Sequence, residues 1–217
     1  MNPLRPALLA SMIAVASAVL ACSPAEAKTT PQAFVQIETN VTASTAIKSF
    51  YTTLVETMKQ GNALGFEGRY KKLDPAVRST FNLPLMTRFA VGYTWARATP
   101  DEQNQLISAF SKFSVATYAS RFTSYDGEQF VVLEEKPAPD GVMVETKLQP
   151  KQGDAVSLNY LMRKDEKGFW RIVDVFLNGS ISELATRRSE FGAIVQREGI
   201  EALLNSLSEK SRQMGPT

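Results

Sequence analysis

Four short segments between residues 129 and 177 are candidate strands, and the second and third of them alternate apolar with polar side chains. Three turn sequences separate the segments, over 137–141, 152–154 and 164–168. Short connections of this kind predict an antiparallel meander, because parallel strands need a crossover of a dozen or more residues. The last segment, 169–177, is apolar on both faces, so we expect it to lie centrally in the sheet with cover on both sides. The chain is therefore restricted to folds built on one antiparallel sheet.

Two strong helical patterns precede the strand segments. Residues 43–60 carry an apolar stripe at helical spacing, which predicts an amphipathic helix. Thr99 and Glu102 have the spacing of a capping box, and Pro100 stands at the first helical position. These residues predict a long helix that ends near Phe122.

The remaining helices are less sharply marked. Three glycines predict an interruption after the first helix: Gly61, Gly65 and Gly68. Short helices are expected over 74–81 and 84–93, and a C-terminal helix is expected to begin near Ser180 or Ser182 and to pause at Gly199. Helices around one antiparallel sheet make an α+β domain. A twisted sheet closed by helices can also enclose an apolar cavity.

The N-terminus has the pattern of a secretory leader. Arg5 precedes an apolar run over 7–20, and a small-x-small sequence ends at Ala27. The run is too short for a spanning helix, which needs about 20 residues. We therefore expect cleavage after Ala27, a single domain over 28–217, and a periplasmic location. A second interpretation is a lipoprotein box in which Cys22 is acylated.

The composition excludes several kinds of chemistry. The chain has no histidine, and its single cysteine lies in the predicted leader, so the mature protein lacks imidazole and thiol groups. The formal net charge is +2 and the basic residues are scattered, which does not favour nucleic-acid binding. We predict a binding protein without a metal or cofactor, not an enzyme. Two alternatives are a docking module that binds no apolar ligand and a hydrolase that uses Glu134 and Asp174 as a carboxylate pair.

Apolar positions on the inward faces of the predicted elements are the candidate cavity lining: Met86, Phe89, Phe110, Phe113, Tyr118, Val144, Leu158, Tyr160, Val173 and Val175. Ordinary core packing is an equally good explanation for each of them. Asp174 lies on an apolar strand and needs a partner, for which Arg88, Arg121 and Arg188 are candidates. The adjacent Arg187 and Arg188 are too close together for both to be buried, and we predict that they form a surface that docks partners.

Several ordered sequence runs resemble one known family. Arg88-Phe89-Ala90-Val91-Gly92-Tyr93-Thr94-Trp95, the helix with Phe110 and Tyr118, Trp170-Arg171-Ile172-Val173-Asp174-Val175, Gly179-Ser180-Ile181-Ser182 and Arg188-Ser189-Glu190-Phe191 resemble the MlaC, or toluene-tolerance, family of periplasmic lipid carriers. The resemblance covers nearly the whole predicted mature chain. It implies a sheet like that of nuclear transport factors, helices around a deep apolar cavity, and lipid binding.

The resemblance also implies a role and a branch. It implies a monomeric carrier that shuttles a phospholipid between membranes together with an inner-membrane ABC lipid transporter and an outer-membrane lipoprotein complex. Pro84-Leu85-Met86 and Ser114-Val115-Ala116-Thr117-Tyr118 resemble the hopanoid-associated HpnM branch, and Thr186-Arg187-Arg188 departs from the Asn-Tyr-Arg sequence of many carriers. A hopanoid is therefore the second candidate ligand.

Overall fold

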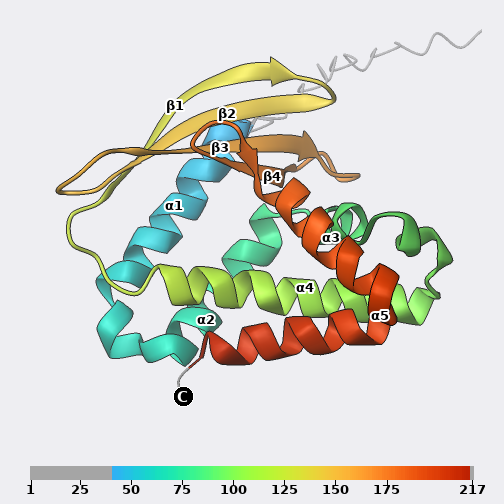
Figure 1. The fold of residues 1–217 in the computed structure, drawn as a ribbon. Helices are drawn as coiled ribbons and strands as arrows, with labels where there is room; N and C mark the ends of the chain where they lie inside the picture. Colours follow the sequence, from blue (N-terminus) through green and yellow to red (C-terminus); the bar gives the residue numbers. More distant parts are fainter. Residues whose placement is uncertain (1–40, 216–217) are drawn as a thin grey trace, which may run out of the picture. The chain divides into compact units, whose positions relative to one another are not determined.

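An antiparallel sheet lies against a group of helices in the computed structural model, which describes residues 41–215. Figure 1 shows the sheet on one side of these helices, with α4 running beneath it. The helical elements are α1 Ala43–Lys59, α2 Gly61–Thr80, α3 Leu83–Val91, the 3-10 helix η1 Gly92–Arg97, α4 Pro100–Arg121 and α5 Glu183–Gln213. The strands are β1 Gln129–Ala138, β2 Gly141–Gln149, β3 Val156–Lys164, β4 Trp170–Leu177 and β5 Ile181–Ser182. The predicted α+β class is confirmed.

The strand order in the sheet is β1-β2-β3-β4-β5, and every neighbouring pair is antiparallel, as the turn sequences predicted. The expected central place of the last long strand is wrong, because β4 lies between β3 and the two-residue β5. Its residues Ile172 and Val173 are nevertheless buried, since α1, α2, α3 and α5 all contact this strand. Helices, not further strands, provide the cover that its apolar faces require.

The capping box at the start of α4 is confirmed. Thr99 Oγ1 accepts a hydrogen bond from Glu102 N at 3.2 Å, and Glu102 Oε2 accepts one from Thr99 N at 2.7 Å. These bonds satisfy free donors at the helix end.

The continuity of α2 differs from the sequence-based expectation, whereas that of α5 agrees with it. The predicted short helix over 74–81 belongs to the longer α2, which continues through Pro75 and has non-helical backbone only at Gly65, with φ 61°. In α5 the predicted pause is confirmed, because Gly199 has φ 87° and ψ 179°. Both glycines adopt backbone conformations that L side chains rarely adopt.

The predicted leader over 1–27 and the alternative acylation site Cys22 lie outside the described residues. Within residues 41–215, no helix combines the length and apolarity that a membrane span requires.

The core of this region is rich in aromatic side chains. Tyr118 on α4 packs its ring 5.3 Å from Phe50 on α1 and 5.6 Å from Phe81 at the end of α2.

Candidate functional site

A pocket of about 130 Å³ lies between α4, strands β3 and β4, and the first turns of α5. Its apolar lining residues are Phe81, Met86, Phe110, Phe113, Tyr118, Phe122, Leu158, Tyr160, Val175, Leu177 and Leu184. The polar lining residues are Ser114, Thr117, Arg121, Glu183 and Arg187. A pocket with mostly apolar walls and few polar groups suits an apolar ligand with a polar portion.

The structure brings seven of the ten candidate lining residues to this pocket: Met86, Phe110, Phe113, Tyr118, Leu158, Tyr160 and Val175. The other three do not line it. Phe89 is 43% exposed on α3, while Val144 and Val173 are buried in the core at 0% and 3% exposure. Sequence periodicity assigns a residue to an inward face, but it does not distinguish a cavity wall from packed core.

Several lining residues were missed by the sequence analysis. Ser114, Thr117 and Arg121 lie three or four residues from one another on α4 and share the face of Phe110, so helical spacing was an available signal. Leu184 and Glu183 reach the pocket because α5 begins directly beside β4. No local pattern in the sequence indicates that the start of α5 lies at the pocket.

Two tyrosines that line the pocket, Tyr118 and Tyr160, together with Tyr51 behind the lining, are called here the tyrosine cluster. The Tyr51 hydroxyl donates to the Tyr160 hydroxyl at 3.0 Å and lies 2.6 Å from Thr146 Oγ1. The Thr146 hydroxyl in turn donates to the carbonyl oxygen of Leu158. These contacts therefore join Tyr51 on α1 to Thr146 on β2 and Tyr160 on β3.

Burial controls the ionisation of this cluster. It raises the pKa of Tyr51 to about 12, against the lowering effect of its hydrogen bonds with Thr146 and Tyr160. Burial also raises the pKa of Tyr118 and of Tyr160, and the charge that a neighbouring tyrosine would carry raises both further. The three phenols thus remain neutral over the physiological pH range.

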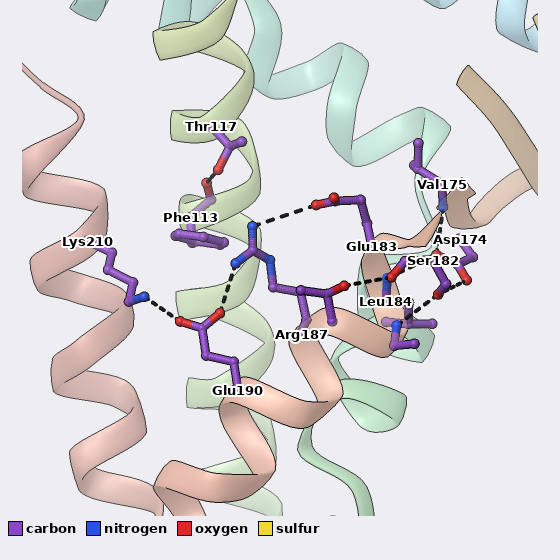
Figure 2. A network of polar contacts seen from close by, with 12 residues as sticks. Phe113, Thr117, Asp174, Val175, Ser182, Glu183, Leu184, Arg187, Glu190 and Lys210 are labelled. Carbon is purple, nitrogen blue, oxygen red and sulfur yellow. Dashed lines mark hydrogen bonds and ion pairs between the residues drawn. The ribbon is translucent and has the colours of Figure 1, made fainter. Parts of the chain in front are cut away.

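A second group of polar residues meets around the start of α5 and is called here the α5 network: Asp174, Ser182, Glu183, Arg187, Glu190 and Lys210 (Figure 2). Asp174 is 7% exposed and accepts hydrogen bonds from Val175 N at 2.7 Å, Ser182 Oγ at 2.6 Å and Leu184 N at 3.0 Å. The expected pairing of Asp174 with an arginine is wrong, because none of its contacts within 41–215 is an ion pair. Donors at the N-terminus of α5 stabilise the buried carboxylate instead.

Arg187 forms the centre of the α5 network. Its side chain is 20% exposed, and its guanidinium lies 2.9 Å from Glu190 Oε2 and 3.8 Å from Glu183 Oε2. The guanidinium carbon also lies 5.0 Å from the centre of the Phe113 ring. Figure 2 shows the two side chains next to each other. Glu190 accepts a further bond from Lys210, which lies beyond the break at Gly199. Arg187 and Glu190 thus each form ion pairs with oppositely charged side chains of the same protein.

Arg188 points away from these groups. It is exposed, its Nη1 donates to the carbonyl oxygen of Phe89 at 2.9 Å, and its guanidinium lies 5.6 Å from the ring of Tyr93. The two adjacent arginines therefore have separate surroundings, and Arg188 is exposed. Their role in docking stays a prediction.

The carboxylates of the hydrolase alternative do not form a pair. Glu134 is on β1 and contacts exposed Lys136, whereas Asp174 is on β4. Three strand spacings separate these strands, about 14 Å, which exceeds the 5 to 9.5 Å between glycosidase carboxylates. Among the described residues no group of three or more metal-ligating side chains gathers in a way that could hold a metal ion.

Both the fold and the sequence are similar to those of known proteins. A solved structure of a phospholipid-binding protein from Ralstonia solanacearum, in complex with a phospholipid, matches with a TM-score of 0.69 and 21% sequence identity. The match covers 79% of this chain and 98% of that chain, and it shows a common fold. The family profile described as MlaC protein matches residues 48–209, about three quarters of the sequence. This chain therefore belongs to the MlaC family.

Proposed function

We propose that this protein binds a lipid in the pocket between α4 and the sheet. The observation that carries the proposal is the aromatic and aliphatic lining of that pocket in a member of the MlaC family. Burial of apolar ligand surface is favourable by about 0.8 kcal/mol per CH2 group, so such a site needs no catalytic residue. The fold neighbour from Ralstonia solanacearum, which was solved with a phospholipid, supports the same class of ligand.

The ligand identity and the cellular role are finer parts of the proposal. A phospholipid is the first candidate, and a hopanoid is the second because of the HpnM-like sequence runs. We further propose a monomeric carrier of 28–217 that shuttles lipid through the periplasm and meets an inner-membrane ABC transporter and an outer-membrane lipoprotein complex. Arg188 is the better docking candidate of the two arginines, since Arg187 already contacts two carboxylates.

The pocket volume defines how a lipid would be held. A cavity of about 150 Å³ accommodates one benzene molecule, so about 130 Å³ holds a ring or part of an acyl chain. Binding a whole lipid therefore requires the pocket to widen, or the rest of the lipid to lie outside it.

Native mass spectrometry of protein purified without detergent tests the proposal. The wild type should carry a lipid mass, and Leu158→Trp should reduce it because the new ring fills the pocket. Val144→Trp is the matched control, because Val144 pairs with Tyr160 in the same sheet but is buried in the core. The control should lose about 1 to 3 kcal/mol of unfolding free energy from overpacking.

Protein that carries no lipid in the wild type, and gains none from vesicles of phospholipid, would favour the docking-module alternative. Equal lipid content in wild type and Leu158→Trp would place the lipid elsewhere on the chain.

A further inference from the structure

One hydroxyl group in the pocket wall has no hydrogen-bond partner among the described residues. The Tyr118 side chain makes no hydrogen bond through its hydroxyl to any residue within 41–215, although it is surrounded by the rings of Phe50, Phe81 and Phe122. A phenol in such surroundings usually has a partner, since an unpaired polar group in an apolar environment is costly.

The free hydroxyl is not sealed inside the core. Among the described residues, the buried side-chain polar atom without a partner is Arg163 Nε. The Tyr118 oxygen therefore keeps contact with open space, and the pocket is the space that Tyr118 lines. Tyr160 lines the same pocket, but its hydroxyl already accepts a bond from Tyr51. Tyr160 is also 2% exposed, whereas Tyr118 is partly exposed, so Tyr118 is the hydroxyl of this cluster that both lines the pocket and has no hydrogen-bond partner within 41–215.

The surroundings of Tyr118 also restrict the charge of the group it can meet. Burial raises the pKa of all three tyrosines, and the same desolvation penalises any anion placed beside them. The two cations of the lining do not outweigh this penalty there: the charge of Arg121 lowers the pKa of Tyr118, but burial raises it by more. Arg187 is matched by Glu183 and Glu190, and Arg121 is exposed. A charged headgroup would therefore lie toward the exposed side of the pocket, away from the cluster.

We propose that the pocket binds its ligand through a neutral oxygen, of a hydroxyl or carbonyl group, that hydrogen-bonds to the Tyr118 hydroxyl within the otherwise apolar wall. This inference rests on the proposed function and specifies the class of ligand. Both an ester carbonyl and an alcohol on a ring system have the required chemistry. A plain hydrocarbon segment at this position leaves the Tyr118 hydroxyl unpaired.

Two small probes of matched shape test the proposal. Toluene and phenol differ by a methyl group in place of a hydroxyl, and both suit a pocket of about 130 Å³. The measured quantity is the Kd of toluene divided by the Kd of phenol, determined by NMR titration of the Leu158 and Val175 amide signals. In Tyr118→Phe this ratio should fall by about fivefold, the factor contributed by one neutral hydrogen bond.

Two control variants make the outcome specific. Tyr160→Phe should leave the ratio unchanged because the Tyr160 side chain is 2% exposed and its hydroxyl is bonded to Tyr51 inside the protein. Tyr125→Phe removes a phenol outside the pocket and should also leave it unchanged. A ratio that Tyr118→Phe does not alter, in a variant that keeps the wild-type Tm, would overturn the proposal while the proposed function stands. If neither probe shifts the pocket signals of the wild type, both proposals fall.

Discussion

The two polar groups on the pocket wall, the α5 network and the tyrosine cluster, differ in how fully their hydrogen-bonding atoms are used. In the α5 network Asp174 accepts three hydrogen bonds, and Arg187, Glu190 and Lys210 form a continuous set of ion pairs. In the tyrosine cluster, two hydroxyls are bonded and that of Tyr118 is free. Fully satisfied buried networks rigidify a structure. The comparison therefore separates a part of the wall that holds the fold from a part that can bind.

The largest effect is expected from the buried carboxylate of the α5 network. Asp174→Ala leaves Ser182 Oγ and Leu184 N without their acceptor, so we expect the unfolding free energy to fall by about 3 kcal/mol. Urea unfolding measures it. Asp101→Ala, in the exposed first turn of α4, is the control and should cost less than about 1 kcal/mol. Equal losses would show that Asp174 does not hold the start of α5.

The second prediction separates the adjacent arginines. Arg187→Ala removes the partner of Glu183 and Glu190 and the cover on Phe113, and we expect a loss of about 2 kcal/mol. Arg188→Ala removes an exposed side chain and should cost less than about 1 kcal/mol. Thermal unfolding of both variants gives the comparison. A larger loss for Arg188→Ala would reverse our assignment of the structural arginine.

The tyrosine cluster should become unstable in alkali. The pKa of Tyr51 is raised from 10.0 to about 12, so its stabilising effect is complete below pH 10 and is lost as the pH rises from 10 toward 12. Between pH 10 and a pH of about 11, the unfolding free energy of the wild type should therefore fall by about 1 kcal/mol more than that of Tyr51→Phe. Urea unfolding across this range measures the difference. Parallel pH profiles for the two proteins would contradict it.

The smallest effect is expected at the acid side, where Glu190 of the α5 network becomes protonated. Burial raises the pKa of Glu190, but hydrogen bonds from Lys210 and Arg187 outweigh it, and the pKa lies below its ordinary 4.5. Its stabilising effect is therefore complete above pH 4.5 and is lost as the pH falls through the lowered value. Glu190→Gln should flatten this part of the stability profile. An unchanged acid profile in Glu190→Gln would remove Glu190 from the residues that set acid stability.

Patterns within a few residues predicted most of the fold. The capping box of Thr99 and Glu102 and the strand meander are confirmed because their causes are local: a helix end needs its donors paired, and short turns force antiparallel pairing. The continuity of α2 through Pro75 was not predicted. A proline in sequence suggests a helix start, but tertiary contacts of the flanking turns determine whether the helix continues.

The site was predictable only in part, for a different physical reason. Inward-facing residues such as Phe110 and Leu158 follow from periodicity, and they line the pocket. Val144 has the same pattern and is packed core. The donors to Asp174 and the free hydroxyl of Tyr118 depend on where separate elements meet, which no spacing in one element specifies.

The strand order has a consequence for how the chain acquires its structure. Each sheet neighbour is also the next strand along the chain, so the pairing closes only short loops and should form early. The bridge between Phe81 and Ile172, with Asn82 N donating to Ile172 O at 2.8 Å, joins segments far apart in sequence. Of the helices before the sheet, α2 and α3 make their main sheet contacts with β4, so these contacts require the last long strand. We therefore expect part of the apolar face of the sheet to be exposed to water and to other chains during folding until these helices dock.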